Sequence, residues 1–393
     1  MALSVLHISK YPARQGGMDE ILRRHAKDPS GNQRFLSLLA IPGSEHVTAE
    51  SDDGMKFQAL QAGIHVPMGF LARRARKAFE RAAPAISLYY NCWGADVLAG
   101  ADASALRIGY VHNHFPGFEA YVNYYASFLD GFLSVSPALH SHICRQVSVE
   151  VAQNSAAMPL PVDELFYEAG RARGTKSAGC VIGFCGRMTR AQKRVDRLPD
   201  LAAGLDAAGV DYRLELLGDG PDRAWLAERL GAHPRVSFLG WRAPASVAKT
   251  FAAWKYVVFT SDYEGQSLAL LEAIAAGCLP VYPDFHVGGE LPGTASQWCL
   301  YPVGDIKSAV ARLLGMEGAS VKELEPLRAE LGAMIARHQP GEYERAFEQW
   351  TEQVRPAGRA QAGPSWRRLV EPVFAYNRYY RRLTDGPRPR SVA

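Results

Sequence analysis

Two glutamates eight positions apart give the strongest chemical signal in this chain of 393 residues. Glu264 lies in the stretch SDYEGQS at 261–267, and Glu272 lies in the apolar stretch LALLEAIAAG that follows. We predict a strand at 256–260 and a helix at 267–276, so Glu264 follows a strand end and Glu272 lies about one turn inside a helix that Ser267 can cap. Carboxylates accept hydrogen bonds from hydroxyl groups, so the pair fits a ligand with vicinal hydroxyls. An isolated glutamate pair is more often solvated surface charge, and the surrounding sequence is what favours a site.

Basic residues follow a second predicted strand, at 180–185. The stretch GRMTRAQKR at 186–194 places Arg187 and Lys193 in one loop at the carboxyl end of that strand. A leaving diphosphate carries about two negative charges and, without a metal ion, needs an arginine fork and a lysine charge in a water-poor site. Basic residues at a helix start are unfavourable for the helix dipole, which favours an anionic partner over a merely solvated loop.

Glycines and histidines at other strand ends give weaker signals. Gly16 and Gly17 come between the first predicted strand and a helix, where the backbone can approach a phosphate or a sugar. Gly218 begins the turn GDGPD, which lacks the third glycine of a dinucleotide fingerprint, so NAD binding is not supported. His112 ends a predicted strand, and His114 is a competing candidate. Each of these, taken alone, is more often a turn or a structural histidine.

The elements that would position these residues alternate along the chain. The predicted strands of the second half are 180–185, 212–217, 236–239, 256–260 and 279–282, and the helices are 195–207, 223–230, 245–254, 267–276 and 306–314. A weaker version in the first half has strands at 4–8, 34–40, 86–90, 108–112 and 131–135. Such alternation predicts parallel sheets wrapped by helices. We predict an α/β fold with two doubly wound, Rossmann-like lobes at 1–168 and 178–340, a linker between them, and a helical extension at 341–393 that packs back on the first lobe.

Composition excludes several classes of protein. The net charge of +4 comes from 44 basic and 40 acidic residues, which is too balanced for a nucleic-acid binder. The six cysteines show no zinc spacing, and no D-x-D sequence stands at a strand end, so we expect neither a metal site nor a cofactor. The start of the chain lacks a signal-peptide pattern, and no run of about 18 apolar residues occurs. These features predict a cytoplasmic protein.

One basic segment bears on membrane contact. Five basic residues are combined over 70–81 with a few apolar ones, of which Phe70, Leu71 and Phe79 could insert into a membrane. The basic residues are Arg73, Arg74, Arg76, Lys77 and Arg81. This pattern fits a helix that lies on an anionic membrane surface, and it fits a solvated basic helix nearly as well. The segment therefore leaves open a peripheral location on the inner face of the membrane.

The residues from 179 to 291 resemble the retaining glycosyltransferases of family four, whose signature is a Glu, seven residues and a second Glu within E-G-x-x-x-x-x-L-E-A. The resemblance implies that Glu272 binds the ribose hydroxyls of a nucleotide diphosphate sugar and that Glu264 lies beside the transferred sugar. It also implies that the backbone amides of Gly265, Gln266 and Ser267 contact the sugar or the diphosphate.

The same resemblance gives roles to the other candidates. Arg187 and Lys193 match the diphosphate-binding pair, which Arg190 and Arg194 fit less well. Gly218 joins the donor-binding residues. In the first lobe, Gly16 and Gly17 match a loop that faces the donor, and His112 matches a histidine near the reaction centre.

At the level of the whole chain, the resemblance implies the GT-B fold, in which two lobes face one another across a cleft. The implied reaction is metal-independent transfer with retention, from a nucleotide diphosphate sugar as co-substrate to a glycan or lipid-linked acceptor in cell-surface polysaccharide or lipopolysaccharide synthesis. The alternatives are another GT-B enzyme, such as an epimerase or a phosphorylase, and a catalytically silent nucleotide-sugar-binding protein.

Overall fold

The computed structural model describes residues 3–9, 17–37, 58–59, 68–98, 102, 104–173, 179–285, 291 and 293–354. Contacts between Cα atoms divide the chain into two compact units. The first lobe contains Met1–Met158 and most of the helix α15 (Glu342–Gln353), and the second lobe contains Pro159–Tyr343. Most of the predicted extension, 355–393, lies outside the described residues, as do Gly16 and the apolar side chains of Phe70 and Leu71.

The first lobe is built on a parallel sheet in the order β3-β2-β1-β4-β5-β6-β7. Its strands are β1 (Val5–Ser9), β2 (Gln33–Ser37), β3 (Gln58–Ala59), β4 (Ile86–Tyr90), β5 (Leu106–Val111), β6 (Gly131–Ser134) and β7 (Ala156–Ala157). Every residue of β1 and β4 is buried, as expected for central strands that helices cover on both faces. The five strands that the sequence predicts for this lobe are present, and the two-residue strands β3 and β7 were too short to predict.

Helices connect the strands of the first lobe. They are α1 (Gly17–Ala26), α2 (Met68–Ala82), α3 (Ala95–Leu98), α4 (Phe118–Ala126), α5 (Pro137–Cys144) and α6 (Val149–Gln153). The helix α15 returns to this lobe, where Glu344 pairs with Arg24 at 3.3 Å and the Trp350 indole donates to the Asn154 carbonyl at 3.0 Å. The rings of Phe347 and His25 meet edge to face at 4.7 Å.

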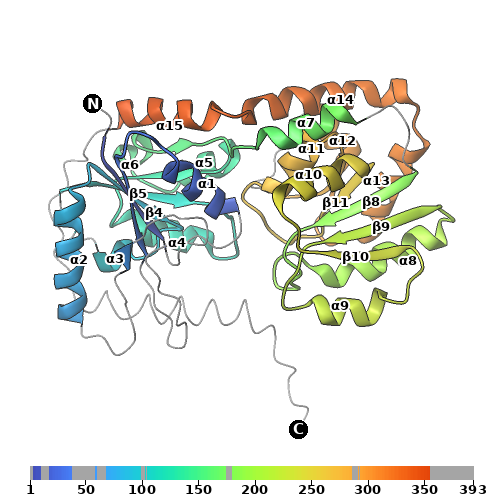
Figure 1. The fold of residues 1–393 in the computed structure, drawn as a ribbon, viewed down its shortest axis with the longest axis horizontal. Coiled ribbons are helices and arrows are strands. Elements are labelled where there is room, and N and C mark those ends of the chain that lie inside the picture. Colours follow the sequence, from blue (N-terminus) through green and yellow to red (C-terminus); the bar gives the residue numbers. More distant parts are fainter. Residues whose placement is uncertain are drawn as a thin grey trace, which may run out of the picture. The chain divides into compact units, whose positions relative to one another are not determined.

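The second lobe has a parallel sheet in the order β10-β9-β8-β11-β12-β13. Its strands are β8 (Cys180–Cys185), β9 (Tyr212–Leu217), β10 (Val236–Gly240), β11 (Tyr256–Val258), β12 (Leu279–Asp284) and β13 (Leu300–Pro302). The chain winds from β8 to β9 and β10, then returns to β11 beside β8. Since parallel crossovers are right-handed, α8 and α9 must cover one face of the sheet and α10 and α11 the other, as Figure 1 shows.

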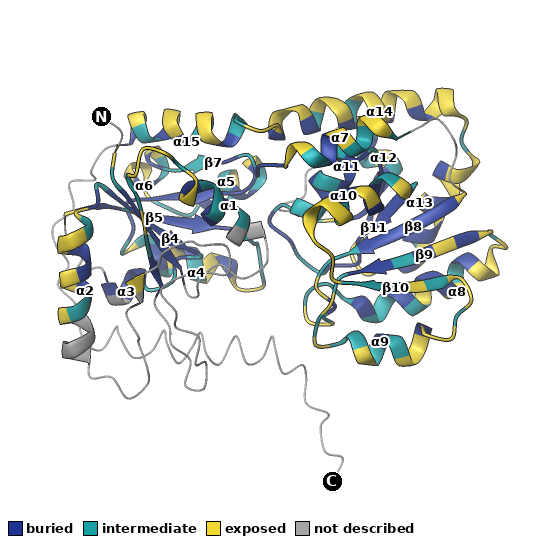
Figure 2. Cartoon of the chain, viewed as in Figure 1, coloured by how far each residue is buried: buried dark blue, intermediate teal, exposed yellow. Residues whose placement is uncertain are grey.

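The helices of the second lobe bury one side and expose the other. They are α7 (Glu164–Ala172), α8 (Leu198–Ala207), α9 (Arg223–Leu230), α10 (Pro244–Ala253), α11 (Leu268–Ala275), α12 (Gly293–Cys299), α13 (Ile306–Gly318) and α14 (Val321–Ile335). Figure 2 shows exposed stripes on α9 and α14 and buried strands in the sheet. Among the described residues, no helix combines the length and the apolar character needed to cross a membrane.

The helix α7 extends into the segment that the sequence assigns to the linker, as far as Ala172. Residues 164–172 form α7, which packs on α10 and α11 and buries Phe166 and Tyr167. The Cα of Gly170 comes so close to α11 that a Cβ there would lie 2.2 Å from the Ala275 carbonyl oxygen. The helix α7 thus buries two aromatic side chains. Contacts between Cα atoms place residues 159–168 in the second unit.

Candidate active site

The strand order of the second lobe reverses between β8 and β11. In open α/β sheets, ligands bind beyond the carboxyl ends of the strands at such a switch point. The loop after β8 carries Arg187 and Lys193, and the loop after β11 carries Glu264. Three of the predicted site residues therefore lie at the switch point of one sheet.

Lys193 and Glu264 form an ion pair between these two loops. The lysine Nζ lies 2.5 Å from Oε1 of the glutamate, whose side chain is only 6% exposed. Ser261 donates its hydroxyl to the same oxygen at 2.7 Å, and the Gln192 amide donates to Oε2 at 3.4 Å. A buried carboxylate requires such partners because it has lost its hydration. The sequence analysis did not identify Ser261 and Gln192 as partners of Glu264. The only signal for them was their position next to the predicted site residues, Gln192 beside Lys193 and Ser261 three residues before Glu264.

A second set of contacts joins the same loops. Asp262 accepts a hydrogen bond from Arg194 at 2.8 Å and forms an ion pair with Arg197 at 2.6 Å. Arg190 instead pairs with Asp222 at 2.8 Å. Arg190 and Arg194, which the sequence ranks behind Arg187 and Lys193 for a diphosphate-binding role, are therefore both held by carboxylates.

Arg187 differs from the other basic residues of its loop. Its side chain is exposed, and it forms no ion pair or hydrogen bond with any residue that the structure describes. The guanidinium can therefore turn toward an anionic ligand without giving up an existing partner. Lys193, in contrast, must share its charge between Glu264 and any ligand.

Gly218 supports the loop that carries Arg187. Its φ is +127°, and a Cβ at this position would lie 2.1 Å from the Gly186 carbonyl oxygen. The Gly186 amide donates to the Leu217 carbonyl at 3.1 Å, and the Gly218 amide donates to the Gly240 carbonyl at 2.9 Å. Only glycine allows this close approach of the loops after β8 and β9.

The helix α11 begins directly after the loop of Glu264. Gly265 and Ser267 are buried, and Ser267 stands at the N-cap position without forming the side-chain cap that the sequence predicts. The side-chain oxygen of Gln266 is buried and accepts no hydrogen bond from the described residues. A buried acceptor without a donor is costly, so a ligand hydroxyl would be stabilised there.

Glu272 lies in the second turn of α11 and is partly buried. Burial and then the Glu272 charge raise the pKa of Cys185, at the end of β8, to about 12, while the Lys193 charge acts in the opposite sense. Glu272 and Lys193 are thus both within electrostatic reach of the end of β8. The structure brings Glu264, Glu272 and Lys193 together around one strand end.

A pocket of about 390 Å³ lies elsewhere in this lobe, between the end of β10 and α10. It is lined by Glu215, Leu239, Arg242, Ser246, Lys249, Thr250 and Ala253. None of the predicted site residues lines it, so the pocket and the switch-point residues are separate features of the described structure.

The first-lobe candidates lie in a different environment. The side chain of His112 packs against Tyr90 and Tyr110, with ring centroids at 5.7 and 4.4 Å, and its Nε2 is buried without a hydrogen bond to any described residue. Burial lowers the pKa of His112 to about 3. The competing residue His114 is 26% exposed. Gly17 begins α1.

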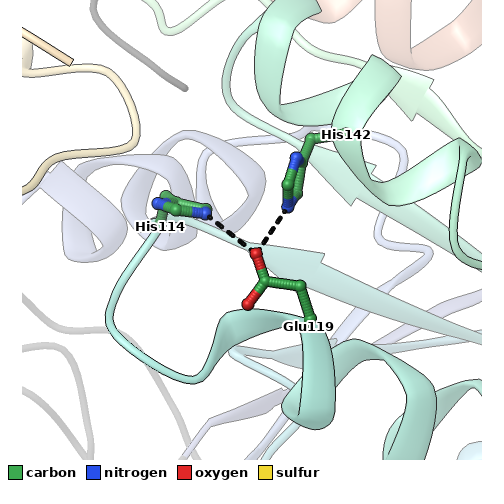
Figure 3. A group of neighbouring side chains, drawn as sticks. All are labelled: His114, Glu119 and His142. Atoms are coloured by element: carbon green, nitrogen blue, oxygen red, sulfur yellow. Dashed lines mark ion pairs between the residues drawn. The ribbon is translucent and has the colours of Figure 1, made fainter. Parts of the chain in front are cut away.

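His114 belongs to a cluster that the sequence did not predict (Figure 3). Its Nε2 and the Nε2 of His142 both face Oε1 of Glu119, at 4.0 and 3.2 Å. Burial lowers the pKa of His114, the charge of His142 lowers it further, and Glu119 opposes the shift. In the described part of the chain this is the one group of three or more such side chains whose spacing could hold a metal ion.

Comparison with known proteins finds a family model that matches the second lobe and curated relatives that match part of the chain. Residues 179–316 match the family model described as Glycosyl transferases group 1. A GDP-mannose-dependent alpha-mannosyltransferase of Mycobacterium tuberculosis is 32% identical over 151 residues, which are 37% of this chain and 38% of that protein. The chain thus spans 38% of the length of this curated relative.

Solved structures extend the likeness in fold to both lobes. The lipopolysaccharide outer core galactosyltransferase WaaB is 17% identical, with a TM-score of 0.61 over 88% of this chain and 99% of that one. Anabaena HepE, solved with UDP-glucose, is 17% identical, with a TM-score of 0.64 over 89% of this chain and 99% of that one. The chain therefore has the two-lobed α/β fold of GT-B proteins, and residues 179–316 of its second lobe are similar to the group 1 glycosyl transferases.

Proposed function

We propose that the protein is a retaining glycosyltransferase that moves a sugar from a nucleotide diphosphate sugar to a glycan or lipid-linked acceptor. The observation that carries this proposal is the buried Lys193–Glu264 ion pair at the switch point between β8 and β11. It stands inside the domain that matches the group 1 glycosyl transferases. The names of the relatives, a mannosyltransferase and a lipopolysaccharide galactosyltransferase, favour a role in cell-surface polysaccharide or lipopolysaccharide synthesis.

The diphosphate is the part of the donor that these loops fit best. Arg187 offers an uncommitted guanidinium, and Lys193 offers an ammonium that is 16% exposed. Together they supply two positive charges for a leaving group of about two negative charges, so the leaving group does not require a metal ion. When the diphosphate arrives, Lys193 exchanges part of its contact with Glu264 for a phosphate oxygen.

The two glutamates divide the rest of the donor between them. Glu272, on α11, binds the ribose hydroxyls, and Glu264 lies beside the transferred sugar with the amides of Gly265, Gln266 and Ser267. Ser261 and Gln192 keep the Glu264 carboxylate in place. This division follows the spacing of the Glu-x7-Glu motif on one loop and one helix.

Transfer with retention needs no protein base in this scheme. The bond from the anomeric carbon to the diphosphate oxygen breaks, and the acceptor oxygen bonds to the same face of the sugar. The acceptor proton passes to the departing diphosphate oxygen. The residues named above stabilise the negative charge that develops on the diphosphate. On the first lobe, His112 remains the predicted neighbour of the reaction centre, with the more exposed His114 as its competitor.

Purified protein incubated with a panel of nucleotide sugars in EDTA tests this proposal. We expect one donor to release its nucleoside diphosphate slowly by hydrolysis, and faster when a suitable acceptor is added. Recovery of an epimerised nucleotide sugar, or cleavage that depends on inorganic phosphate, would instead favour an epimerase or a phosphorylase. Binding without turnover of any donor would indicate a catalytically silent protein.

The proposal also includes a peripheral location of the protein on an anionic membrane. Arg73, Arg76, Lys77 and Arg81 of α2 are exposed, whereas Phe79, which the sequence offers as an inserting residue, is buried in the lobe. Phe79 therefore does not insert, and the exposed basic residues attract an anionic surface with about 1 kcal/mol each. We expect sedimentation with anionic vesicles at low salt that falls at physiological salt and in a variant with these four residues changed to Gln. A soluble acceptor becomes the better proposal if the wild-type protein stays in the supernatant at low salt.

A further inference from the structure

The cluster of His114, Glu119 and His142 belongs to the first lobe, whereas the loops proposed above to bind the diphosphate belong to the second. One member of the cluster, His114, is also the competing candidate for the histidine near the reaction centre. His114 follows β5, Glu119 lies in the first turn of α4, and His142 lies on α5. These three segments are separate in the chain, and the sheet brings them to one place (Figure 3). Both imidazole rings direct Nε2 toward one carboxylate oxygen of Glu119.

The distances suit a metal ion of ordinary radius. The three ligand atoms all lie within 4.8 Å of one another, with 3.2 Å from His142 to Glu119 and 4.0 Å from His114 to Glu119. Bonds of about 2.0–2.2 Å to tetrahedral zinc place ligand atoms about 3.3–3.6 Å apart. The His142–Glu119 pair is close to this spacing, and His114 has to move nearer to the other two ligands to reach it.

The Nε2 atoms of the two histidines are also without hydrogen-bond partners among the described residues. The Nε2 atoms of His114 and His142 are both buried from solvent. The Nε2 of His142 is close to Glu119 in distance but is not aligned as a hydrogen bond. Buried polar atoms without partners are costly, and a bound metal ion would satisfy both at once.

The charge and chemistry of the cluster select a cation. A carboxylate between two imidazoles repels anions, and the combination of imidazole and carboxylate ligands suits zinc and its neighbours among the transition metals. The guanidinium of Arg145 opposes metal binding, because its Nη2 lies 3.5 Å from Nδ1 of His142. In a histidine that binds a metal ion through one ring nitrogen, the other ring N–H usually donates a hydrogen bond to an acceptor, and a guanidinium cannot accept one. Arg145 is exposed and can turn into solvent.

We propose that His114, Glu119 and His142 bind one transition-metal dication of the zinc class, with the fourth coordination position open to water or to a ligand oxygen. This site belongs to the first lobe and goes beyond the proposed transfer reaction, since its failure would leave the roles of Arg187, Lys193 and the two glutamates unchanged.

The test uses protein without a histidine tag, stripped with EDTA and dialysed, then titrated with zinc sulfate by calorimetry and with cobalt by absorption spectroscopy. We expect one equivalent of zinc per chain, a cobalt spectrum of tetrahedral type, and a thermal midpoint that rises with zinc. Glu119→Gln, at a side chain that is 57% exposed, should fold normally and bind zinc at least about tenfold more weakly. His142→Gln should give the same loss.

Two further variants separate this site from general histidine binding. His140→Gln removes a histidine of the same helix that lies beside Cys144, and it should leave zinc affinity unchanged. Arg145→Gln removes the opposing charge and should bind zinc as tightly as wild type or more tightly. The proposal is overturned if the wild-type protein takes up no zinc, or if Glu119→Gln and His142→Gln bind it with wild-type affinity and wild-type thermal shift.

Discussion

The two lobes share one architecture but hold their candidate residues in different ways. In the second lobe, Lys193 and Glu264 are paired at 2.5 Å, and Asp262 ties the same two loops together through Arg194 and Arg197. In the first lobe, His112 packs among tyrosines with its Nε2 buried, and Gly17 contributes only backbone. A network of charged contacts at a switch point indicates a site that is preorganised before any ligand arrives, whereas a buried strand-end histidine does not.

We expect the largest loss of transfer activity from substitutions of Arg187 and Lys193, the two residues proposed to bind the diphosphate. Arg187→Ala and Lys193→Ala should each lower the rate of transfer by about two to three decades, because each removes one preorganised charge from the leaving group. Lys193→Ala should also lower the thermal midpoint, since it leaves the buried Glu264 without its ion-pair partner. Steady-state rates with the donor found by the nucleotide-sugar panel measure the first effect.

Arg190→Ala is the matched control, because Arg190 is on the same loop but pairs with Asp222 at the surface. Its rate of transfer should stay close to that of wild type. Equal losses in Arg187→Ala and Arg190→Ala would mean that the loop acts only through its general charge, and the comparison between the lobes would lose its basis.

The two glutamates give the next largest effect. Glu272→Gln should weaken the donor and the free nucleoside diphosphate together, by about 1.5–3 kcal/mol for a charged hydrogen bond. Glu264→Gln should harm transfer but leave the free nucleotide bound as tightly as before or more tightly, because Lys193 no longer shares its charge with a carboxylate. Calorimetry with the free nucleotide distinguishes the two, and a similar loss of affinity in both variants would contradict the division of roles.

The smallest effect concerns acid stability and belongs to the first lobe. Burial lowers the pKa of His7 to about 4 and that of His112 to about 3, from an ordinary value of 6.5. The unfolded chain therefore binds more protons below pH 6.5, so stability is complete above that pH and falls as the pH drops toward these folded values. Each histidine contributes about 1.4 kcal/mol per pH unit in that range.

Urea unfolding at pH 7.5 and pH 5.5 measures this loss. His112→Phe keeps an aromatic ring against Tyr90 and Tyr110 but removes the titrating group. The variant should therefore lose less stability than wild type on acidification. An unchanged difference between the two pH values would show that His112 is not buried as a neutral ring.

Much of the second lobe could be predicted from the sequence. The strands β8 and β9 and the helix α9 have the predicted bounds, because each is a continuous run of one period between clear turn residues. The sequence predicts the loop that carries Glu264 and the helix that carries Glu272, since one strand, one loop and one helix fix their spacing, and the roles of the two residues stay predictions. The partners Ser261, Gln192 and Asp262 could not be predicted, because their contacts join loops that only the sheet brings together.

The failures of prediction have physical reasons of the same kind. The end of the helix α7, residues 169–172, consists of small and basic residues, so its sequence looked like a linker. The cluster of His114, Glu119 and His142 spans three elements with no regular spacing, and no local pattern marks it. A single sequence does not show which distant residues the fold brings together.

Binding of free nucleoside diphosphates in EDTA tests the central claim most directly, because it needs neither the acceptor nor the sugar. Calorimetry should find a nucleoside diphosphate that binds the wild-type protein and the Arg190→Ala variant with equal affinity, and that binds Arg187→Ala and Glu272→Gln at least about tenfold more weakly. Binding to none of the nucleoside diphosphates, or equal affinity in all four proteins, would contradict the assignment of the donor to the loops after β8 and β11.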